Sequence, residues 1–136
     1  MRILGMLVLV GALLATGAAA SPRPATFSTF AGDWRGHTRS LLITRTGQAE
    51  EVVDDGCCTR VISAHFKLLR PSGTVTDAAV AFRVTAVRRW DAPGHRPRVG
   101  QLGRLRLRDG ILVDLLTGMN YCNDRARPVR ARLCGA

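Results

Sequence analysis

The residues with the most specific chemistry in this chain are its four cysteines. Cys57 and Cys58 are adjacent, and Cys122 and Cys134 lie near the C-terminal end. Four cysteines allow three pairings. A bond between neighbours departs from normal bridge geometry, and neighbouring side chains in extended backbone point to opposite faces. We therefore predict no free thiol and no Cys57–Cys58 bond, but two bridges that join this pair to Cys122 and Cys134, each worth about 4 kcal/mol in the chain-entropy model.

A metal site is the alternative use of these cysteines. Asp54, Asp55 and His65 lie close to the adjacent cysteines, and Met119 lies close to Cys122. Zinc sites, however, usually space their cysteines about two to four residues apart. Thiols of exported proteins also tend to oxidise to disulfides. The sequence therefore predicts no metal and no other cofactor.

Acid–base catalysis would need a histidine beside a carboxylate. The candidate pairs are His37 with Asp33, and His65 with Asp54 or Asp55. Nothing in their spacing brings either pair together. The chain also lacks the Gly-x-Ser-x-Gly elbow that would supply an activated serine. These observations predict no catalytic residue.

Two pairs of adjacent carboxylates, Glu50-Glu51 and Asp54-Asp55, could form an acid–base dyad. Adjacent residues in a strand point to opposite faces, which argues against a dyad at either pair. The run Asp54-Asp55-Gly56 instead predicts a turn whose carboxylates bind backbone amides. We therefore predict that the protein is not an enzyme, with a secreted hydrolase as an alternative.

Three arginines form the most suggestive binding motif. Arg104, Arg106 and Arg108 alternate with leucines, so a strand would place their guanidinium groups on one face at intervals of about 7 Å. Arg83, on the preceding predicted strand, would extend this row into a basic plate. Guanidinium groups bind phosphate and carboxylate in a bidentate manner. The simpler interpretation, which the composition favours, is that arginine coats the wet side of a sheet.

The net charge of the chain also favours binding of an anionic partner. Its 136 residues include 20 basic and 10 acidic side chains, for a net charge of +10, and every basic residue except Lys67 is an arginine. The simpler explanation, which we favour for the composition, is a GC-rich genome whose codons encode arginine more often than lysine. The functional explanation is an acidic partner such as a wall polymer, an anionic lipid surface or nucleic acid. For an exported protein, envelope polyanions are favoured over nucleic acid. One Tyr, four Phe and two Trp form too thin a stacking platform for nucleic acid.

The N-terminal residues predict a secretory signal peptide. A basic start at Met1-Arg2 precedes an apolar run from Ile3 to Leu14, and Ala18-Ala19-Ala20 ends in the small residues of a cleavage site. We expect the mature chain to begin near Ser21 and to be secreted or held in the cell envelope. No later apolar stretch approaches the ~20 residues of a membrane-spanning helix.

The remainder of the chain predicts a single all-β domain over residues 30–136, after a flexible lead-in over residues 21–29. Asp109-Gly110 is the strongest hairpin signal. Short connections favour antiparallel neighbours, which gives a meander of six to eight strands in a small barrel or a sandwich. Pro71-Ser72-Gly73 would end the clearest strand, and Asp33–His37 and the tail could add strands. The six expected strands are Ser40–Thr44, Gln48–Val53, Arg60–Leu69, Asp77–Val87, Leu102–Arg108 and Ile111–Leu116.

The chain also carries two resemblances to known proteins. Gly32-Asp33-Trp34 is similar to the Gly-x-Trp that opens up-and-down barrels of the lipocalin and avidin type, in which the Trp closes one end. Most of the mature chain also resembles small exported proteins of high-GC Gram-positive bacteria, a group without an assigned activity. That resemblance implies export and disulfide bridges. Its matching stretches are Gly32 to Arg39, Asp54-Asp55-Gly56-Cys57-Cys58, Gly103 to Gly110, Thr117-Gly118, Tyr121-Cys122 and Cys134-Gly135-Ala136.

Together these observations predict an exported, non-catalytic binding module whose partner is an anionic envelope polymer held by the arginine-rich face. A small apolar ligand inside a barrel is the first alternative. A protease inhibitor that presents the loop Asp91–Arg98 is another. A hollow interior would favour the small ligand, and salt-sensitive binding would favour the polymer.

Overall fold

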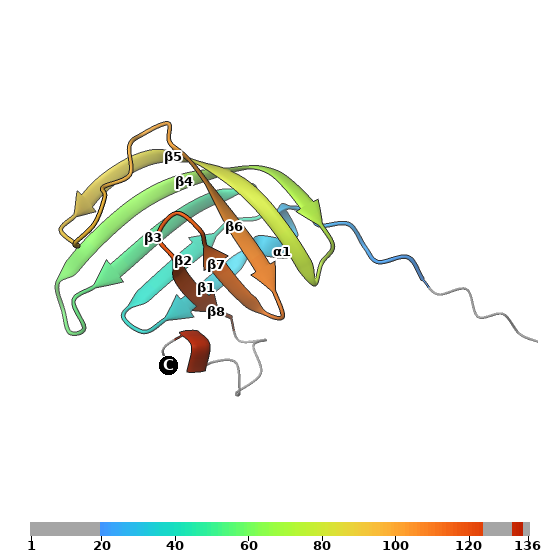
Figure 1. Cartoon of the computed structure of the whole chain (residues 1–136), viewed down its shortest axis with the longest axis horizontal. Helices are drawn as coiled ribbons and strands as arrows, with labels where there is room; N and C mark the ends of the chain where they lie inside the picture. Colours follow the sequence, from blue (N-terminus) through green and yellow to red (C-terminus); the bar gives the residue numbers. More distant parts are fainter. Residues whose placement is uncertain (1–19, 124–131, 135–136) are drawn as a thin grey trace, which may run out of the picture.

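The computed structural model describes residues 20–123 and 132–134 of the chain. Residues 1–19 of the predicted signal peptide, and residues 124–131 and 135–136 of the tail, therefore lie outside the described residues. Eight antiparallel strands follow one another around a closed barrel, as Figure 1 shows. The strands are β1 (Gly32–Gly36), β2 (Arg39–Ile43), β3 (Gln48–Asp54), β4 (Arg60–Gly73), β5 (Asp77–Trp90), β6 (Leu102–Arg108), β7 (Ile111–Asp114) and β8 (Met119–Cys122).

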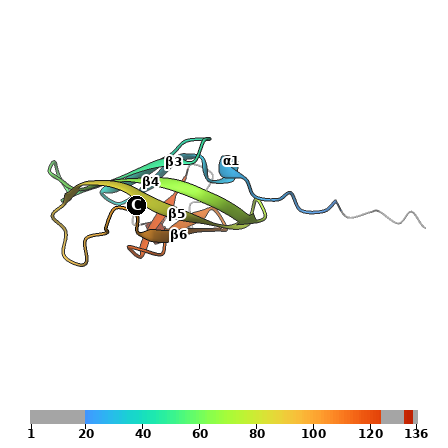
Figure 2. The ribbon, with the colours of Figure 1, turned by 90° about the horizontal axis from the view of Figure 1, so that it is seen from above.

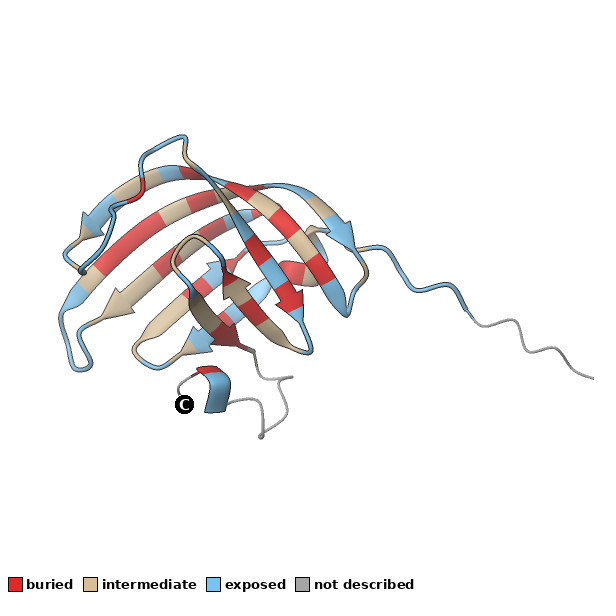
Figure 3. Ribbon diagram, in the orientation of Figure 1, coloured by how far each residue is buried: buried red, intermediate tan, exposed pale blue. Residues whose placement is uncertain are grey.

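The all-β class and the antiparallel meander are confirmed, and the barrel rather than the sandwich is the observed form. Alternation explains the strands: Leu105 and Leu107 of β6 are buried while the arginines between and beside them are exposed. Figure 3 shows a related banding along the longer strands β4 and β5, where buried residues alternate mainly with half-buried ones. The hairpin between β6 and β7 turns at Asp109 and Gly110, both with positive φ, as predicted.

The core lies inside the barrel as one contiguous cluster of buried aromatic and aliphatic side chains. The rings of Phe66 and Phe82 lie 4.7 Å apart between their centroids, on the neighbouring strands β4 and β5. Trp34 of β1 is buried, and its indole N–H donates to the carbonyl of Phe30 over 2.7 Å. The structure therefore anchors the start of β1 through a buried tryptophan.

Two local features differ from what the sequence led us to expect. The one-turn helix α1 (Phe27–Phe30) spans the boundary expected between the lead-in and the domain, and its Phe30 side chain is buried in the core. The predicted end of strand β4 at Leu69 is wrong. The strand continues through Pro71 and Ser72 and ends at Gly73. The register of β4 with β5 shifts between Leu68 and Pro71, and such a bulge tolerates a residue without a backbone N–H.

The two ends of the barrel differ. Helix α1 lies at one end, and the loops that follow β3 and β5 extend from the other, as Figures 1 and 2 show. A short 3-10 helix, η1 (Arg132–Cys134), follows on from β8 and contacts it. The backbone N–H of His37 donates to the carbonyl of Cys134 over 2.9 Å, so η1 also contacts the β1–β2 connection.

Candidate functional site

The predicted arginine row exists as an exposed feature of β6. Arg104, Arg106 and Arg108 lie on the outer face of the barrel, because Leu105 and Leu107 take the inward positions. A carboxylate of Asp77 on β5 lies 3.7 Å from Arg106, and both side chains are about half exposed. Exposed pairs of this kind contribute little to stability. The row therefore retains its cationic character.

The fourth predicted residue, Arg83, is exposed on β5 and extends the same outer face. It pairs across the sheet with Leu102 of β6 and with Lys67 of β4. Arg104 pairs with Ala81, two positions before Arg83 on β5. Arg83 and Arg104 are therefore diagonal neighbours, and the basic plate spans β5 and β6 as predicted.

An aliphatic column runs beside the arginines, a feature that was not predicted from the sequence. On β7, Ile111 pairs with Arg108 and Val113 pairs with Arg106. Leu115, just beyond β7, donates its N–H to the carbonyl of Arg104 over 2.9 Å, and 55% of its surface is exposed. A row of cations thus borders a row of apolar side chains.

A groove of about 480 Å³ borders this face where β6, β7 and β8 meet η1. Arg106, Arg108, Val113, Asn120 and Leu133 are among its lining residues. Leu133 of η1 is 60% exposed, and its carbonyl accepts a hydrogen bond from the Asn120 side chain over 3.4 Å. The groove combines cationic and apolar walls, which suits a chain that carries anions along a carbon backbone.

The cysteines pair differently from the prediction. Cys57 bonds to Cys58, and Cys122 bonds to Cys134. None of the four is a free thiol, as predicted. The prediction assumed extended backbone at residues 57–59, but these residues belong to a tight loop in which a carboxylate oxygen of Asp55 accepts three backbone N–H bonds. In that loop, neighbouring side chains are not forced to opposite faces.

A second polar site lies inside the barrel and was not predicted from the sequence. Glu51 of β3 has no exposed surface, and the hydroxyl of Tyr121 donates a hydrogen bond to its Oε1 atom. The Oε2 atom is buried and has no hydrogen-bond partner within the described part of the chain. Burial, with the nearby Asp114 carboxylate, raises the pKa of Glu51 to about 7.

The neighbours of Glu51 are themselves shifted by burial. Burial raises the pKa of Asp114, whose carboxylate accepts bonds from the Leu116 N–H over 2.8 Å and the Thr117 hydroxyl over 3.0 Å. Burial and Glu51 together raise the pKa of the Tyr121 hydroxyl. The Arg39 guanidinium lies 5.7 Å from the centre of the Tyr121 ring. A pKa near 7 would suit a general acid, but Glu51 exposes no surface to a substrate.

In the described residues, no hydrogen bond or ion pair joins His37 to Asp33, or His65 to Asp54 or Asp55. His65 lies opposite Glu50 on the outer face of β3 and β4 rather than beside Asp54 or Asp55. Asp33 forms an ion pair with Arg35. Among the described residues, no group of three or more histidine, cysteine, aspartate or glutamate side chains could hold a metal ion.

None of the helices in the described part of the chain has the length and apolar character needed to cross a bilayer. The two resemblances drawn from short motifs remain predictions. No family model, curated protein or solved structure matches this chain.

Proposed function

We propose that this protein is an exported, non-catalytic binding module that holds an anionic envelope polymer on the outer face of β5, β6 and β7. The binding residues are Arg83, Arg104, Arg106 and Arg108. One observation carries the proposal: three exposed arginines occupy successive outward positions of β6, beside an aliphatic column on β7. Export rests on the predicted signal peptide.

The spacing of this row matches a repeating anion. Outward positions of a strand recur about every 7 Å, and the paired backbone of β6 fixes the direction in which each arginine leaves the sheet. A phosphate or carboxylate that repeats along a polymer could contact successive guanidinium groups. The aliphatic column of Ile111, Val113 and Leu115 would cover the carbon chain between the anions.

The interior supports an outer rather than an inner site. Inward positions carry a contiguous cluster of large side chains that includes Trp34, Phe66, Phe82 and Tyr121. An apolar ligand inside the barrel would have to displace these rings. The outer face needs no such rearrangement, because its arginines are already exposed.

A triple substitution tests the site. Arg104→Gln, Arg106→Gln and Arg108→Gln together are expected to raise the Kd for a poly(glycerol phosphate) polymer at least about tenfold, which corresponds to about 1.4 kcal/mol. Binding of the unchanged protein should weaken as salt rises, because exposed charges are screened beyond about 8 Å at physiological ionic strength. Fluorescence anisotropy with a labelled polymer measures both effects.

The matched control removes the same charge from other elements. Arg45, Arg70 and Arg98 are exposed on a turn, on β4 and on a loop, and they do not form a row. Replacing these three with glutamine is expected to change the Kd less than about twofold, because no contact is lost and only the long-range field weakens. Equal losses from the two triple variants would refute a defined site and leave only a basic surface.

A further inference from the structure

The loop between β3 and β4 presents an exposed disulfide between two adjacent residues, Cys57 and Cys58. We propose that this bond is a reversible thiol–disulfide exchange site. It would accept two electrons from a dithiol and be restored by an oxidant of the disulfide class. Exposed bridges are generally the labile or catalytic ones, whereas buried structural bridges resist reduction.

The Cys57–Cys58 bond has features that favour reduction. Its Cα atoms are 3.8 Å apart, because the residues are adjacent, whereas ordinary bridges join Cα atoms about 4.4 to 6.8 Å apart. Both residues are exposed, so an attacking thiolate can reach either sulfur. Departure from the ordinary Cα spacing makes a bridge easier to reduce. The exposure of the two sulfur atoms and the short Cα spacing therefore both favour reduction of the Cys57–Cys58 bond.

This bond also constrains the fold very little. The entropy that a bridge removes from the unfolded chain grows with the loop that it closes, and this bridge closes the shortest loop that two residues can form. The other bridge is different in each respect. Cys122 and Cys134 are 12 residues apart in sequence and both are buried, and their bond ties η1 to β8. Bracing accounts for the second bridge and not for the first.

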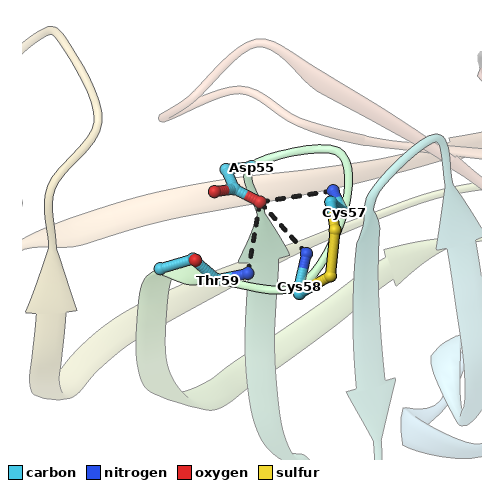
Figure 4. The surroundings of a disulfide bond; sticks show 4 residues. All are labelled: Asp55, Cys57, Cys58 and Thr59. Carbon is cyan, nitrogen blue, oxygen red and sulfur yellow. Dashed lines mark hydrogen bonds between the residues drawn. A yellow bond between two sulfur atoms is a disulfide. The ribbon is translucent and has the colours of Figure 1, made fainter.

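The loop keeps its shape by means other than the sulfur–sulfur bond. Figure 4 shows one carboxylate oxygen of Asp55 accepting the backbone N–H groups of Cys57, Cys58 and Thr59, each over 3.2 Å. The Asp55 N–H in turn donates to the carbonyl of Thr59 over 2.9 Å. These backbone bonds lower the pKa of Asp55, so its carboxylate stays ionised at neutral pH. After reduction, the same bonds would hold the two thiols side by side for re-oxidation.

The exchange balances without any further reactant. A thiolate of the dithiol attacks one sulfur of the Cys57–Cys58 bond, forms a mixed disulfide and releases the other cysteine as a thiolate, which takes up a proton. The second thiol of the dithiol then loses its proton and attacks the mixed disulfide. The products are two cysteine thiols and one oxidised dithiol, so two electrons and two protons have moved to the protein.

Equilibration of the folded protein with mixtures of reduced and oxidised dithiothreitol tests the proposal. After alkylation, peptide mass spectrometry gives the reduced fraction of each cysteine pair. The Cys57–Cys58 bond is expected to be half reduced at a reduced-to-oxidised ratio at least about tenfold lower than the Cys122–Cys134 bond needs. The thermal midpoint should not change when only the first bond is open. Reduction of both bonds at the same ratio, or a peptide that links Cys57 or Cys58 to Cys122 or Cys134, would overturn the proposal.

Two variants separate exchange from a structural role. Replacing Cys57 and Cys58 with serine should abolish the first reduction step and leave the thermal midpoint unchanged; a large fall in the midpoint would show that the bond braces the fold. Asp55→Ala should slow re-oxidation of the reduced pair several-fold, because the thiols lose the backbone bonds that hold them together. Re-oxidation at the unchanged rate would contradict the role given to Asp55.

Discussion

Replacing Glu51 with glutamine is expected to remove most of the fall in stability that the protein undergoes between about pH 4.5 and pH 7. Burial raises the pKa of Glu51 from 4.5 to about 7, and each unit of pKa difference corresponds to about 1.4 kcal/mol. The expected fall in the free energy of unfolding of the unchanged protein is therefore roughly 3 kcal/mol over this range.

The sign follows from where the proton binds. Between pH 4.5 and 7 the folded protein keeps Glu51 protonated, while the unfolded chain has already released that proton. Folding therefore takes up a proton, and stability falls as the pH rises. The full contribution is present below about pH 4.5, and it is lost by the time the pH has passed about 7. Glutamine cannot ionise, but its carbonyl oxygen can still accept the hydrogen bond from Tyr121.

Urea denaturation at a series of pH values, followed by circular dichroism, measures this difference. At pH 8 the Glu51→Gln protein should be more stable than the unchanged protein, whereas near pH 4.5 the two should be similar. Glu50→Gln is the matched control, since it removes a carboxylate from the opposite face of the same strand. The control should keep the pH dependence of the unchanged protein. An unaltered slope in Glu51→Gln would show that Glu51 is not the group that titrates.

Phe82→Ala is expected to lower the free energy of unfolding by about 4 kcal/mol, the largest effect of a single change that we predict. Phe82 has no exposed surface and its ring packs against that of Phe66. It also lies over Gly103, which pairs with it across β5 and β6. A side chain at Gly103 would overlap the Phe82 ring, so the glycine makes room for the aromatic ring.

This arrangement predicts a specific coupling between the two residues. Gly103→Ala alone should cost about 1 to 3 kcal/mol, because the new methyl group collides with the ring. In the Phe82→Ala background the same change should cost almost nothing, since the methyl group then occupies vacated space. Leu102→Ala is the control. Leu102 is 59% exposed, so this substitution should change the free energy of unfolding by less than about 0.5 kcal/mol. Additive effects of the two core changes would contradict this packing.

Most of the strands could be predicted because half-buried strands alternate strictly in hydrophobicity. The bounds expected for β6 are those observed, and its leucines and arginines face as predicted. The closing strand β8 has only four residues and was expected only as part of the tail. Alternation also cannot tell a barrel from a sandwich, because both place one face inside. Only the pairing of β1 with β8 decides this.

The cysteines show why a rule of local geometry can fail. The prediction followed from extended backbone around Cys57 and Cys58, and no residue in that stretch signals otherwise except the turn at Asp54-Asp55-Gly56. That turn was predicted, but its extent was not. Asp55 binds three successive backbone N–H groups, so the bent region includes both cysteines. Only the structure shows how far the carboxylate reaches.

The interior acid site could not be predicted for a different reason. The alternation of β3 does place Glu51 on the same face as Ala49, which is buried. A glutamate, however, is almost never fully buried unless it is paired, so an inward position is not expected for it. Its partner Tyr121 is 70 residues away in sequence, and no local pattern links the two. Long-range closure of the barrel creates this site.

Closure of the barrel also affects whether two copies of the protein can associate through their strand edges. In the described part of the chain, the join between β1 and β8 is a single pair, Arg35 with Cys122, and is shorter than the pairing of β8 with β7 on its other side. A closed ring of strands offers no free edge on which another chain could add a strand. Separation of β1 from β8 would expose the free edges of both strands at once. Cys122, one partner in this join, is also bonded to Cys134 of η1. Reducing that bond is therefore expected to loosen the join and to favour intermolecular strand addition.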